Sequence, residues 1–228
     1  MVECVQVKGK RPKNKNMKTA IVLGSTGLIG KEITHQLLNN TNYSKVIILV
    51  RSKQNTSHPK LEQIVFDFNN PNEAAIQGDD LFCCLGTTIK KAGTKEAFYK
   101  VDYDYVVNTA KIAKANGIKQ FAVISSMGAS ETSGIFYNKT KGQMENAVKA
   151  IGFTCTYIIR PSMLLGKREE FRLGEMIGKA FMTVFSFLIP KKYKAIYDLQ
   201  VAKATIHFMN ENTSGFFVKE NDDLLNVR

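Results

Sequence analysis

Apolar runs and helical patterns alternate along the chain from residue 18 onward. Residues 19–23 form an apolar run that ends at a glycine-rich turn, and residues 29–38 carry apolar side chains at helical spacing. Residues 46–50 form a second apolar run, rich in β-branched side chains. This order predicts a strand, a helix and a second strand, which together make one βαβ unit with parallel strands.

The same alternation continues to about residue 160. Further strands are predicted at residues 62–66, 80–85, 120–124 and 154–159, and helices separate the later ones at residues 95–116 and 136–150. We therefore expect an α/β fold: a Rossmann-type, doubly wound and mainly parallel sheet with helices on both faces. Its ligand crevice should lie at the carboxyl ends of the strands. A helical stretch from residue 201 is expected to cover the sheet edge.

The chain has 228 residues, of which 44% are hydrophobic, and this suits one compact domain. Residues 1–16 are polar and basic without a period, so we expect a flexible extension before a domain that spans residues 17–228. The longest apolar stretch, residues 180–189, is shorter than the ~20 residues that cross a bilayer. Because the first residues lack the apolar centre of a secretory signal, the expected location is cytoplasmic.

The formal charge of +12 does not by itself indicate a nucleic-acid partner. Six basic residues against one acidic residue before Thr19 supply five of the twelve charges, and no interleaved aromatic and basic pattern follows. We therefore expect no nucleic-acid partner. The cysteines and histidines show no metal-ligand spacing, so no metal site is expected, and the adjacent Cys83 and Cys84 are interpreted as small buried hydrophobes.

A glycine-rich turn stands between the first predicted strand and helix. Its glycine spacing lets the backbone turn tightly and approach a pyrophosphate at the helix N-terminus. A turn that only packs the helix against the strand would have the same spacing. We interpret the turn as a dinucleotide site made of Gly24, Ser25, Thr26, Gly27, Leu28, Ile29 and Gly30.

Arg51 ends the second predicted strand, 21 residues after Gly30. NAD-specific proteins place an acidic residue on the ribose hydroxyls at this point. A guanidinium matches the oxygens of a 2′-phosphate instead, so the position favours NADP(H) over NAD(H). An ordinary surface arginine is the alternative interpretation.

Two further strand ends carry weaker candidates for the cofactor site. Asp67 and Phe68 end the third predicted strand, where they would flank adenine, although capping of the strand end explains Asp67 equally well. Near the cofactor ribose, the fourth predicted strand ends at Leu85, Gly86 and Thr87.

Candidate acid and base groups follow the fifth predicted strand. Ser125 and Ser126 come directly after that strand, and Tyr137 and Lys141 lie at the start of the next helical pattern, four residues apart on one helical face. A cation beside a phenol stabilises the phenolate, which makes Tyr137 a candidate proton donor. The alternative is an incidental surface pair, because this spacing occurs by chance in many helices.

These motifs, GSTGLIG, ISS and YNKTK, resemble the short-chain dehydrogenase/reductase superfamily in order and spacing. The stretches CLGTT, VDYDYVVNTAKIAKANGIKQFAVISSMGAS, YNKTKGQME, IIRPSMLLG and RLGE are more closely similar to the atypical family that includes the Tat-interactive-protein oxidoreductase and its bacterial relatives. The resemblance covers residues 18–175. It implies an NADP(H)-dependent oxidoreductase that reduces a carbonyl group on a small substrate.

The resemblance also implies roles for individual residues. Ser126 would donate a hydrogen bond to the substrate carbonyl, Tyr137 would donate the proton, and Lys141 would hold the nicotinamide ribose. Ser52 would join Arg51 at the 2′-phosphate, although a second arginine is common there in the close family. The remaining cofactor contacts would come from Pro161, Met163, Leu164 and Arg172.

The segment after about residue 161 shapes the substrate pocket in this superfamily. Residues 171–189 are rich in Met and Phe, which favours an apolar substrate. A helix that completes the core and an amphipathic helix at a membrane surface are the alternatives. Two other functions stay open: a non-catalytic NADP(H) sensor that acts on a protein partner, and an NAD-dependent nucleotide-sugar epimerase.

Overall fold

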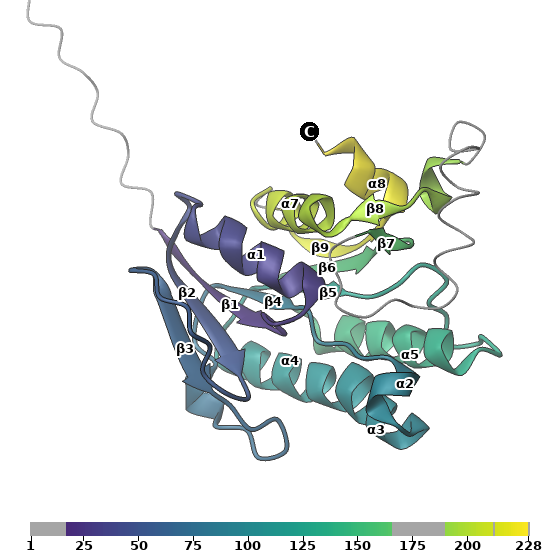
Figure 1. Cartoon of the computed structure of the whole chain (residues 1–228), viewed down its shortest axis with the longest axis horizontal. Helices are drawn as coiled ribbons and strands as arrows, with labels where there is room; N and C mark the ends of the chain where they lie inside the picture. The colour runs from purple at the N-terminus through teal and green to yellow at the C-terminus, as the bar shows by residue number, and fades with distance from the viewer. Residues whose placement is uncertain (1–16, 166–189, 212, 228) are drawn as a thin grey trace, which may run out of the picture.

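A single parallel sheet forms the centre of the molecule (Figure 1). The computed structural model describes residues 17–165, 190–211 and 213–227. The sheet order is β3-β2-β1-β4-β5-β6-β9, and every neighbouring pair is parallel. The strands are β1 (Lys18–Leu23), β2 (Tyr43–Val50), β3 (Leu61–Val65), β4 (Asp80–Cys83), β5 (Gln120–Ile124), β6 (Cys155–Arg160) and β9 (Gly215–Glu220).

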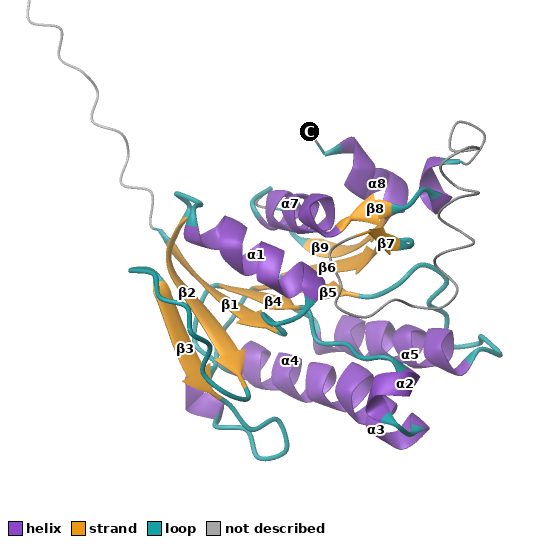
Figure 2. Cartoon of the chain, viewed as in Figure 1, coloured by secondary structure: helices purple, strands orange, loops and turns teal. Residues whose placement is uncertain are grey.

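Helices cover both faces of this sheet, as Figure 2 shows. On one face lie α1 (Leu28–Leu38), α7 (Asp198–Met209) and the short α8 (Asn221–Asn226). On the other face lie α4 (Tyr105–Ala115) and α5 (Phe136–Ile151). Shorter elements connect them: η1 (Glu73–Ala75), α2 (Ile89–Ala92), α3 (Lys95–Tyr99), η2 (Lys100–Asp104), β7 (Leu164–Leu165), η3 (Lys191–Tyr193) and β8 (Ile196–Tyr197).

Two hydrophobic clusters fill the spaces between the sheet and its helices. The first joins β1 and β2 to Ile33 of α1 and Val201 of α7, and the second joins the opposite sheet face to Ala110 of α4 and Val148 of α5. Parallel strands buried on both faces need continuous apolar side chains, and the last four residues of β1 and the last five of β2 have them. The fold expected from the sequence, a single-domain doubly wound Rossmann sheet, is confirmed.

The structure corrects three details of that expectation. Residues 95–116 do not form one helix, because the π-helical turn η2 separates α3 from α4. The stretch from residue 201 belongs to α7, which packs beside α1 on a face of the sheet and not over its edge. The edge itself is β9, a strand that the sequence pattern did not indicate.

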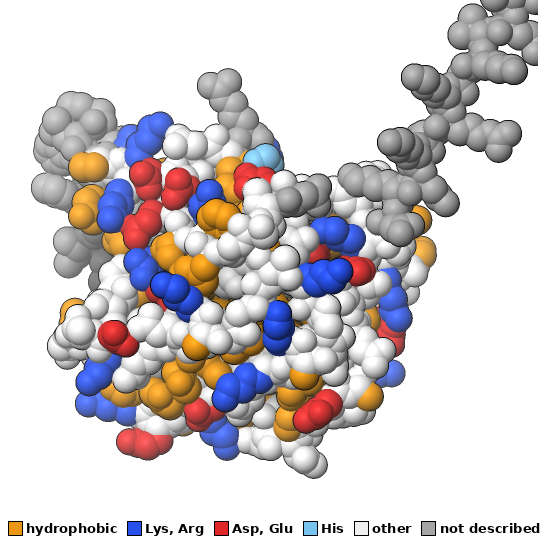
Figure 3. Space-filling view, turned by 180° about the vertical axis from the view of Figure 1, so that it is seen from behind, with side chains coloured by type: hydrophobic (Ala, Val, Ile, Leu, Met, Phe, Trp, Pro, Cys, Tyr) orange, Lys and Arg blue, Asp and Glu red, His pale blue; other side chains and the backbone are white. Residues whose placement is uncertain are grey.

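Charge is spread over the face of the molecule shown in Figure 3, where Lys and Arg side chains lie among Asp and Glu side chains. Among the residues that the structure describes, no helix is both long and apolar enough to cross a bilayer.

Candidate functional site

The sheet order reverses between β1 and β4, so the connections after these two strands leave in opposite directions and open a crevice at their carboxyl ends. The glycine-rich turn lies on one side of this crevice. Gly24 has a φ of 72°, which favours glycine, and its carbonyl oxygen accepts a hydrogen bond of 2.9 Å from the Gly27 N–H. A Cβ at residue 30 would lie 2.1 Å from the same oxygen, so Gly30 allows α1 to pack against the turn.

The turn fits a pyrophosphate because the backbone N–H groups at the start of α1 are free to donate hydrogen bonds to an anion. The first N–H groups of a helix have no partner within the helix, and Gly27 caps α1 without a side-chain hydrogen bond. No acidic residue lies in the first turn of α1 to repel an anion. The buried Ser25 Oγ also lacks a hydrogen-bond partner among the described residues.

The end of β4 packs directly against this turn. A Cβ at residue 24 would lie 2.5 Å from the carbonyl oxygen of Cys84, so only glycine permits this approach. Gly86 follows, and a Cβ there would lie 3.8 Å from Lys141 Nζ. The sequence-predicted residues Leu85 and Gly86 therefore lie between the phosphate turn and the candidate catalytic lysine.

Lys141 is buried and forms an ion pair with Asp102, a residue of η2. The Lys141 Nζ lies 2.7 Å from Asp102 Oδ1, and Asp102 Oδ2 accepts a hydrogen bond of 2.8 Å from the Thr87 N–H. Burial alone would lower the pKa of Lys141, but Asp102, with a smaller contribution from Tyr137, raises it above its ordinary value. Lys141 is therefore a fixed cation at the site.

Tyr137 lies one helical turn before Lys141 on α5. Its ring packs against Phe98 of α3, with ring centroids 5.5 Å apart, and Phe98 is fully buried. The phenol is half-buried. The ring is therefore supported on its apolar side by α3, while Lys141 is near enough to interact with it electrostatically.

The two serines after β5 differ in their partners. Ser125 Oγ donates a hydrogen bond of 2.5 Å to Glu145 Oε1 of α5. Ser126 Oγ is buried but has no hydrogen-bond partner within the described part of the chain. The hydroxyl of Ser126 is thus available to a ligand, whereas that of Ser125 already serves the fold.

The loop after Ser126 packs onto the start of α5. The Ser130 N–H donates a hydrogen bond of 3.1 Å to the Asn138 carbonyl oxygen, and a Cβ at residue 142 would lie 2.2 Å from the Ser130 carbonyl carbon. Asn138 follows Tyr137 and Gly142 follows Lys141. The loop therefore brings the Ser126 end of β5 to the part of α5 that carries both residues.

Arg51, Ser52 and Asp67 lie at the outer end of the crevice, after β2 and β3, and all three are exposed. Asp67 Oδ1 accepts hydrogen bonds from the Asn69 N–H (2.9 Å) and side-chain amide (3.2 Å), which is the strand-end capping that the sequence left open. The ring of Phe68 packs against that of Tyr105, with centroids 5.3 Å apart.

Pro161, Met163 and Leu164 follow β6 on the other side of Ser126. The Pro161 carbonyl oxygen accepts a hydrogen bond of 3.1 Å from the Met127 N–H, so this stretch adjoins the serine. Arg172 and the whole of residues 171–189, the Met- and Phe-rich candidate for the substrate pocket, lie outside the described residues.

The sequence analysis did not identify Asp102 as part of the site, although its position in the helical pattern of residues 95–116 indicated a buried carboxylate. Asp102 lies four residues after Phe98 and four before Val106, and both are buried. A carboxylate at an apolar position of a helical pattern requires a buried partner. Cys83 is buried, as expected, and burial raises the pKa of its thiol to about 12, whereas Cys84, expected to be buried as well, is half-buried.

Comparison with known proteins identifies relatives over most of the chain. A family model described as NAD(P)H-binding matches residues 24–181. The protein HTATIP2 of Rattus norvegicus is 38% identical over 170 residues, covering 72% of this chain and 70% of that protein. The protein named "FMP52, mitochondrial" of Meyerozyma guilliermondii is 38% identical over 202 residues, covering 82% of this chain and 83% of that protein. That name assigns the yeast protein to mitochondria; the cytoplasmic location expected here remains a prediction.

Solved structures show the same fold at low identity. A UDP-N-acetylglucosamine 4-epimerase of Methanobrevibacter ruminantium matches with a TM-score of 0.68 and 18% identity, covering 90% of this chain and 76% of that one. Vestitone reductase from alfalfa matches with a TM-score of 0.62 and 21% identity, covering 89% and 76%. At such identities the likeness extends to the fold alone.

Proposed function

Because the chain belongs to the NAD(P)H-binding family, together with relatives such as HTATIP2, we propose that it is an NADP(H)-dependent oxidoreductase that reduces the carbonyl group of a small molecule. The single observation that carries this proposal is the buried cation of Lys141, which lies beside Tyr137 and next to the Gly86 end of β4. Burying a charge is costly unless it is paired, as Lys141 is with Asp102, and buried ionisable groups cluster at functional sites.

The residues of the site can perform the proton chemistry of such a reduction. Ser126 Oγ donates a hydrogen bond to the substrate carbonyl oxygen, and Tyr137 OH delivers the proton to that oxygen. Lys141 stabilises the phenolate that remains, and Asp102 keeps Lys141 charged and in place. NADPH, when bound at the turn from Gly24 to Gly30, supplies the reducing equivalents.

The choice of NADP(H) over NAD(H) rests on Arg51. Its guanidinium is exposed after β2, beside the crevice, where a 2′-phosphate could accept two hydrogen bonds from it. The apolar nature of the substrate rests on the Met- and Phe-rich composition of residues 171–189. The preference for NADP(H) and the apolar substrate are therefore both proposed.

The test combines binding and turnover in one set of variants. Titrations with NADPH and NADH measure cofactor affinity, and a screen of aldehydes, ketones and quinones with NADPH identifies a substrate. Tyr137→Phe removes the proton donor but keeps the ring against Phe98, so NADPH affinity should stay within about threefold while kcat falls by about 10²- to 10⁴-fold. Tyr197→Phe is the control, because Tyr197 is exposed and lies on the separate strand β8.

Full activity in the Tyr137→Phe variant would place the proton donor elsewhere. A protein that binds NADPH tightly but reduces no compound in the screen would contradict the enzymatic proposal and leave the sensor hypothesis.

A further inference from the structure

Asn221, the first residue of α8, is fully buried, and its side chain makes three hydrogen bonds, all of them to backbone groups. Its Oδ1 accepts a hydrogen bond of 3.1 Å from the Ser162 N–H. Its Nδ2 donates to the carbonyl oxygens of Lys191 (3.0 Å) and Lys194 (2.8 Å). One side chain thus joins the stretch that follows β6 to the stretch that contains η3.

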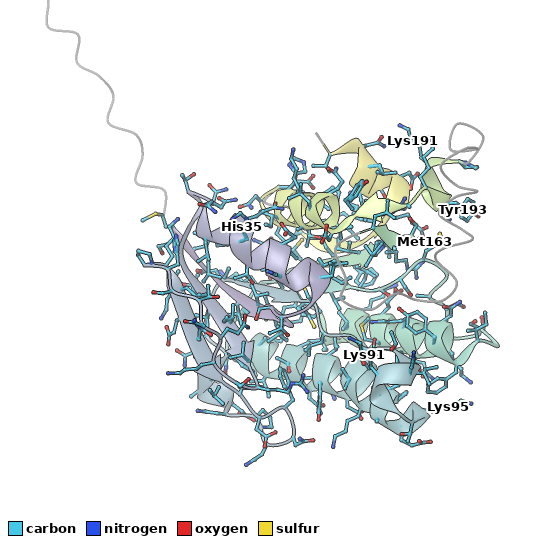
Figure 4. The ribbon with its side chains drawn as sticks, viewed as in Figure 1. His35, Lys91, Lys95, Met163, Lys191 and Tyr193 are labelled. Atoms are coloured by element: carbon cyan, nitrogen blue, oxygen red, sulfur yellow. The ribbon has the colours of Figure 1, made fainter. Side chains whose placement is uncertain are left out.

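Additional bonds tie the same two stretches together. Ser162 Oγ donates to the Lys194 carbonyl oxygen. The Ile196 N–H donates a hydrogen bond of 3.0 Å to the Met163 carbonyl oxygen, and Leu164 pairs with Ile196 in the short β7–β8 ladder. Figure 4 shows Met163, Tyr193 and Lys191 on this side of the molecule.

Glu220, the residue before Asn221, fixes the start of α8 to the sheet. Its carboxylate pairs with Arg160 (3.2 Å), the last residue of β6, and with Lys192 (3.1 Å) of η3. It also forms a capping box with Asp223. Asn221 is therefore held at the end of β9 by charges as well as by the backbone of its helix.

The first of the two stretches joined by Asn221, residues 161–164, adjoins the candidate catalytic residue Ser126. Arg160 pairs with Glu145, which accepts the hydrogen bond of Ser125, and the Pro161 carbonyl oxygen accepts from the Met127 N–H. The stretch from Pro161 to Leu164 therefore borders Ser126. Side-chain bonds are important there, because only Leu164 within this stretch belongs to a regular element.

We propose that Asn221 is a positioning residue for the nicotinamide half of the dinucleotide site: it fixes the backbone at residues 161–164 from outside the motifs that bind the cofactor. The inference rests on the proposed function, because it takes those residues as neighbours of the nicotinamide. In this proposal, helix α8, near the C-terminal end of the described chain, helps to hold the nicotinamide half of the site in place.

Two ligands separate this role from general damage to the fold. NADPH contacts both halves of the site, whereas adenosine 2′,5′-bisphosphate is only the adenine half of that cofactor. Asn221→Ala leaves the Ser162 N–H without its acceptor and takes one donor from each of the carbonyl oxygens of Lys191 and Lys194, which loosens residues 161–164. We expect it to weaken NADPH about tenfold and adenosine 2′,5′-bisphosphate less than about twofold in equilibrium titrations.

Asn226→Ala is the matched control, since Asn226 lies on the same short helix but is exposed, and within the described part of the chain its side chain accepts a hydrogen bond only from the Lys191 ammonium. It should change neither affinity by more than about twofold. If Asn221→Ala does not fold, Ser162→Ala removes only the hydroxyl bond to Lys194 and tests the same tie, with the same selective loss expected at about threefold. Hydrogen exchange of the amides of residue 162 and of Ile196, which donates to the Met163 carbonyl oxygen, should become faster in either variant when measured without ligand.

Equal losses for both ligands, or no loss for NADPH, would overturn the positioning role. Failure of the unmodified protein to bind either ligand would instead contradict the proposed function, so the two failures are distinguishable.

Discussion

At the scale of single residues, the charge on Lys141 depends on one carboxylate. Asp102 raises the pKa of Lys141 against the opposite effect of burial. The stabilisation that this raised pKa contributes is complete below the ordinary pKa of lysine and is lost as the pH rises through the raised value. The pair therefore stabilises the fold throughout the neutral range and weakens only in strong alkali.

Asp102→Asn keeps the shape of the side chain and its acceptor for the Thr87 N–H but removes the charge opposite Lys141. Burial then dominates, so the pKa of Lys141 should fall and the alkaline limb of the kcat/KM profile should move to lower pH. Breaking a buried ion pair costs about 3 to 5 kcal/mol of unfolding free energy, which urea denaturation measures. Asp104→Asn, in the same π-helical turn, is the control. An unchanged alkaline limb would show that Lys141 does not govern the profile.

Arg51 offers a second residue-scale prediction. Arg51→Ala should weaken NADPH about tenfold and leave NADH within about twofold, because only NADPH carries the 2′-phosphate that the guanidinium would bind. The effect should shrink as salt is added, since the side chain is exposed. Lys45→Ala, which removes a cation from β2, serves as the control in the same titrations. Equal losses for both cofactors would assign Arg51 another role.

At the scale of elements, the turn between β1 and α1 depends on close backbone approach. Gly30→Ala would place a Cβ 2.1 Å from the Gly24 carbonyl oxygen, so the turn or the helix must move. We expect a loss of about 1 to 3 kcal/mol in unfolding free energy and a clear loss of NADPH affinity. Gly134→Ala, where the added Cβ meets no atom within 4 Å, should be neutral in both measurements.

Local patterns predicted most of the elements and the motifs that they carry. The strands β1, β2, β5 and β6 each contain a run of apolar residues, and α5 has a helical period, so their positions follow from neighbouring residues. Strand β9 was missed because its sequence, GFFVKE, has no fully buried residue and ends in two charged side chains; its pairing with β6 depends on residues far away in the chain. The π-helical turn η2 was missed for the same reason, because the ion pair that it makes possible joins Asp102 to Lys141, 39 residues later in the chain.

The residues of the candidate site likewise fall into those that the sequence predicted and those that it did not. Gly24, Tyr137 and Lys141 follow from motif spacing, and Ser126 follows from the resemblance to the superfamily; in the structure they lie after β1, on α5 and after β5. Asn221 could not be found from spacing, because its partner Ser162 lies 59 residues earlier and both residues are ordinary in their local sequence. Contacts between distant strands decide such positions, and a single sequence does not display them.

At the scale of the whole molecule, β9 contributes to the cores on both faces of the sheet. Phe216 packs against one cluster and Phe217 against the other, where its ring stacks on Tyr157 with centroids 5.2 Å apart. Phe217→Ala should lower the unfolding free energy by about 1 to 3 kcal/mol, because the ring is half-buried. Val218→Ala is the comparison: Val218 is 38% exposed and should cost less than about 1 kcal/mol. Equal effects would mean that β9 adds little to either core.

The position of β9 in the sequence also determines how long β6 waits for its neighbouring strand during synthesis. Glu220 follows Arg160 by 60 residues, so a ribosome that adds about 5 to 20 residues per second needs roughly 3 to 12 seconds to deliver it. During that interval β6 is the outermost strand of the nascent sheet, and its unpaired N–H and carbonyl groups can bind a strand from another chain. Crowded translation of the same message should therefore favour aggregates that join through β6, and a chaperone that covers that edge should have its greatest effect in those seconds.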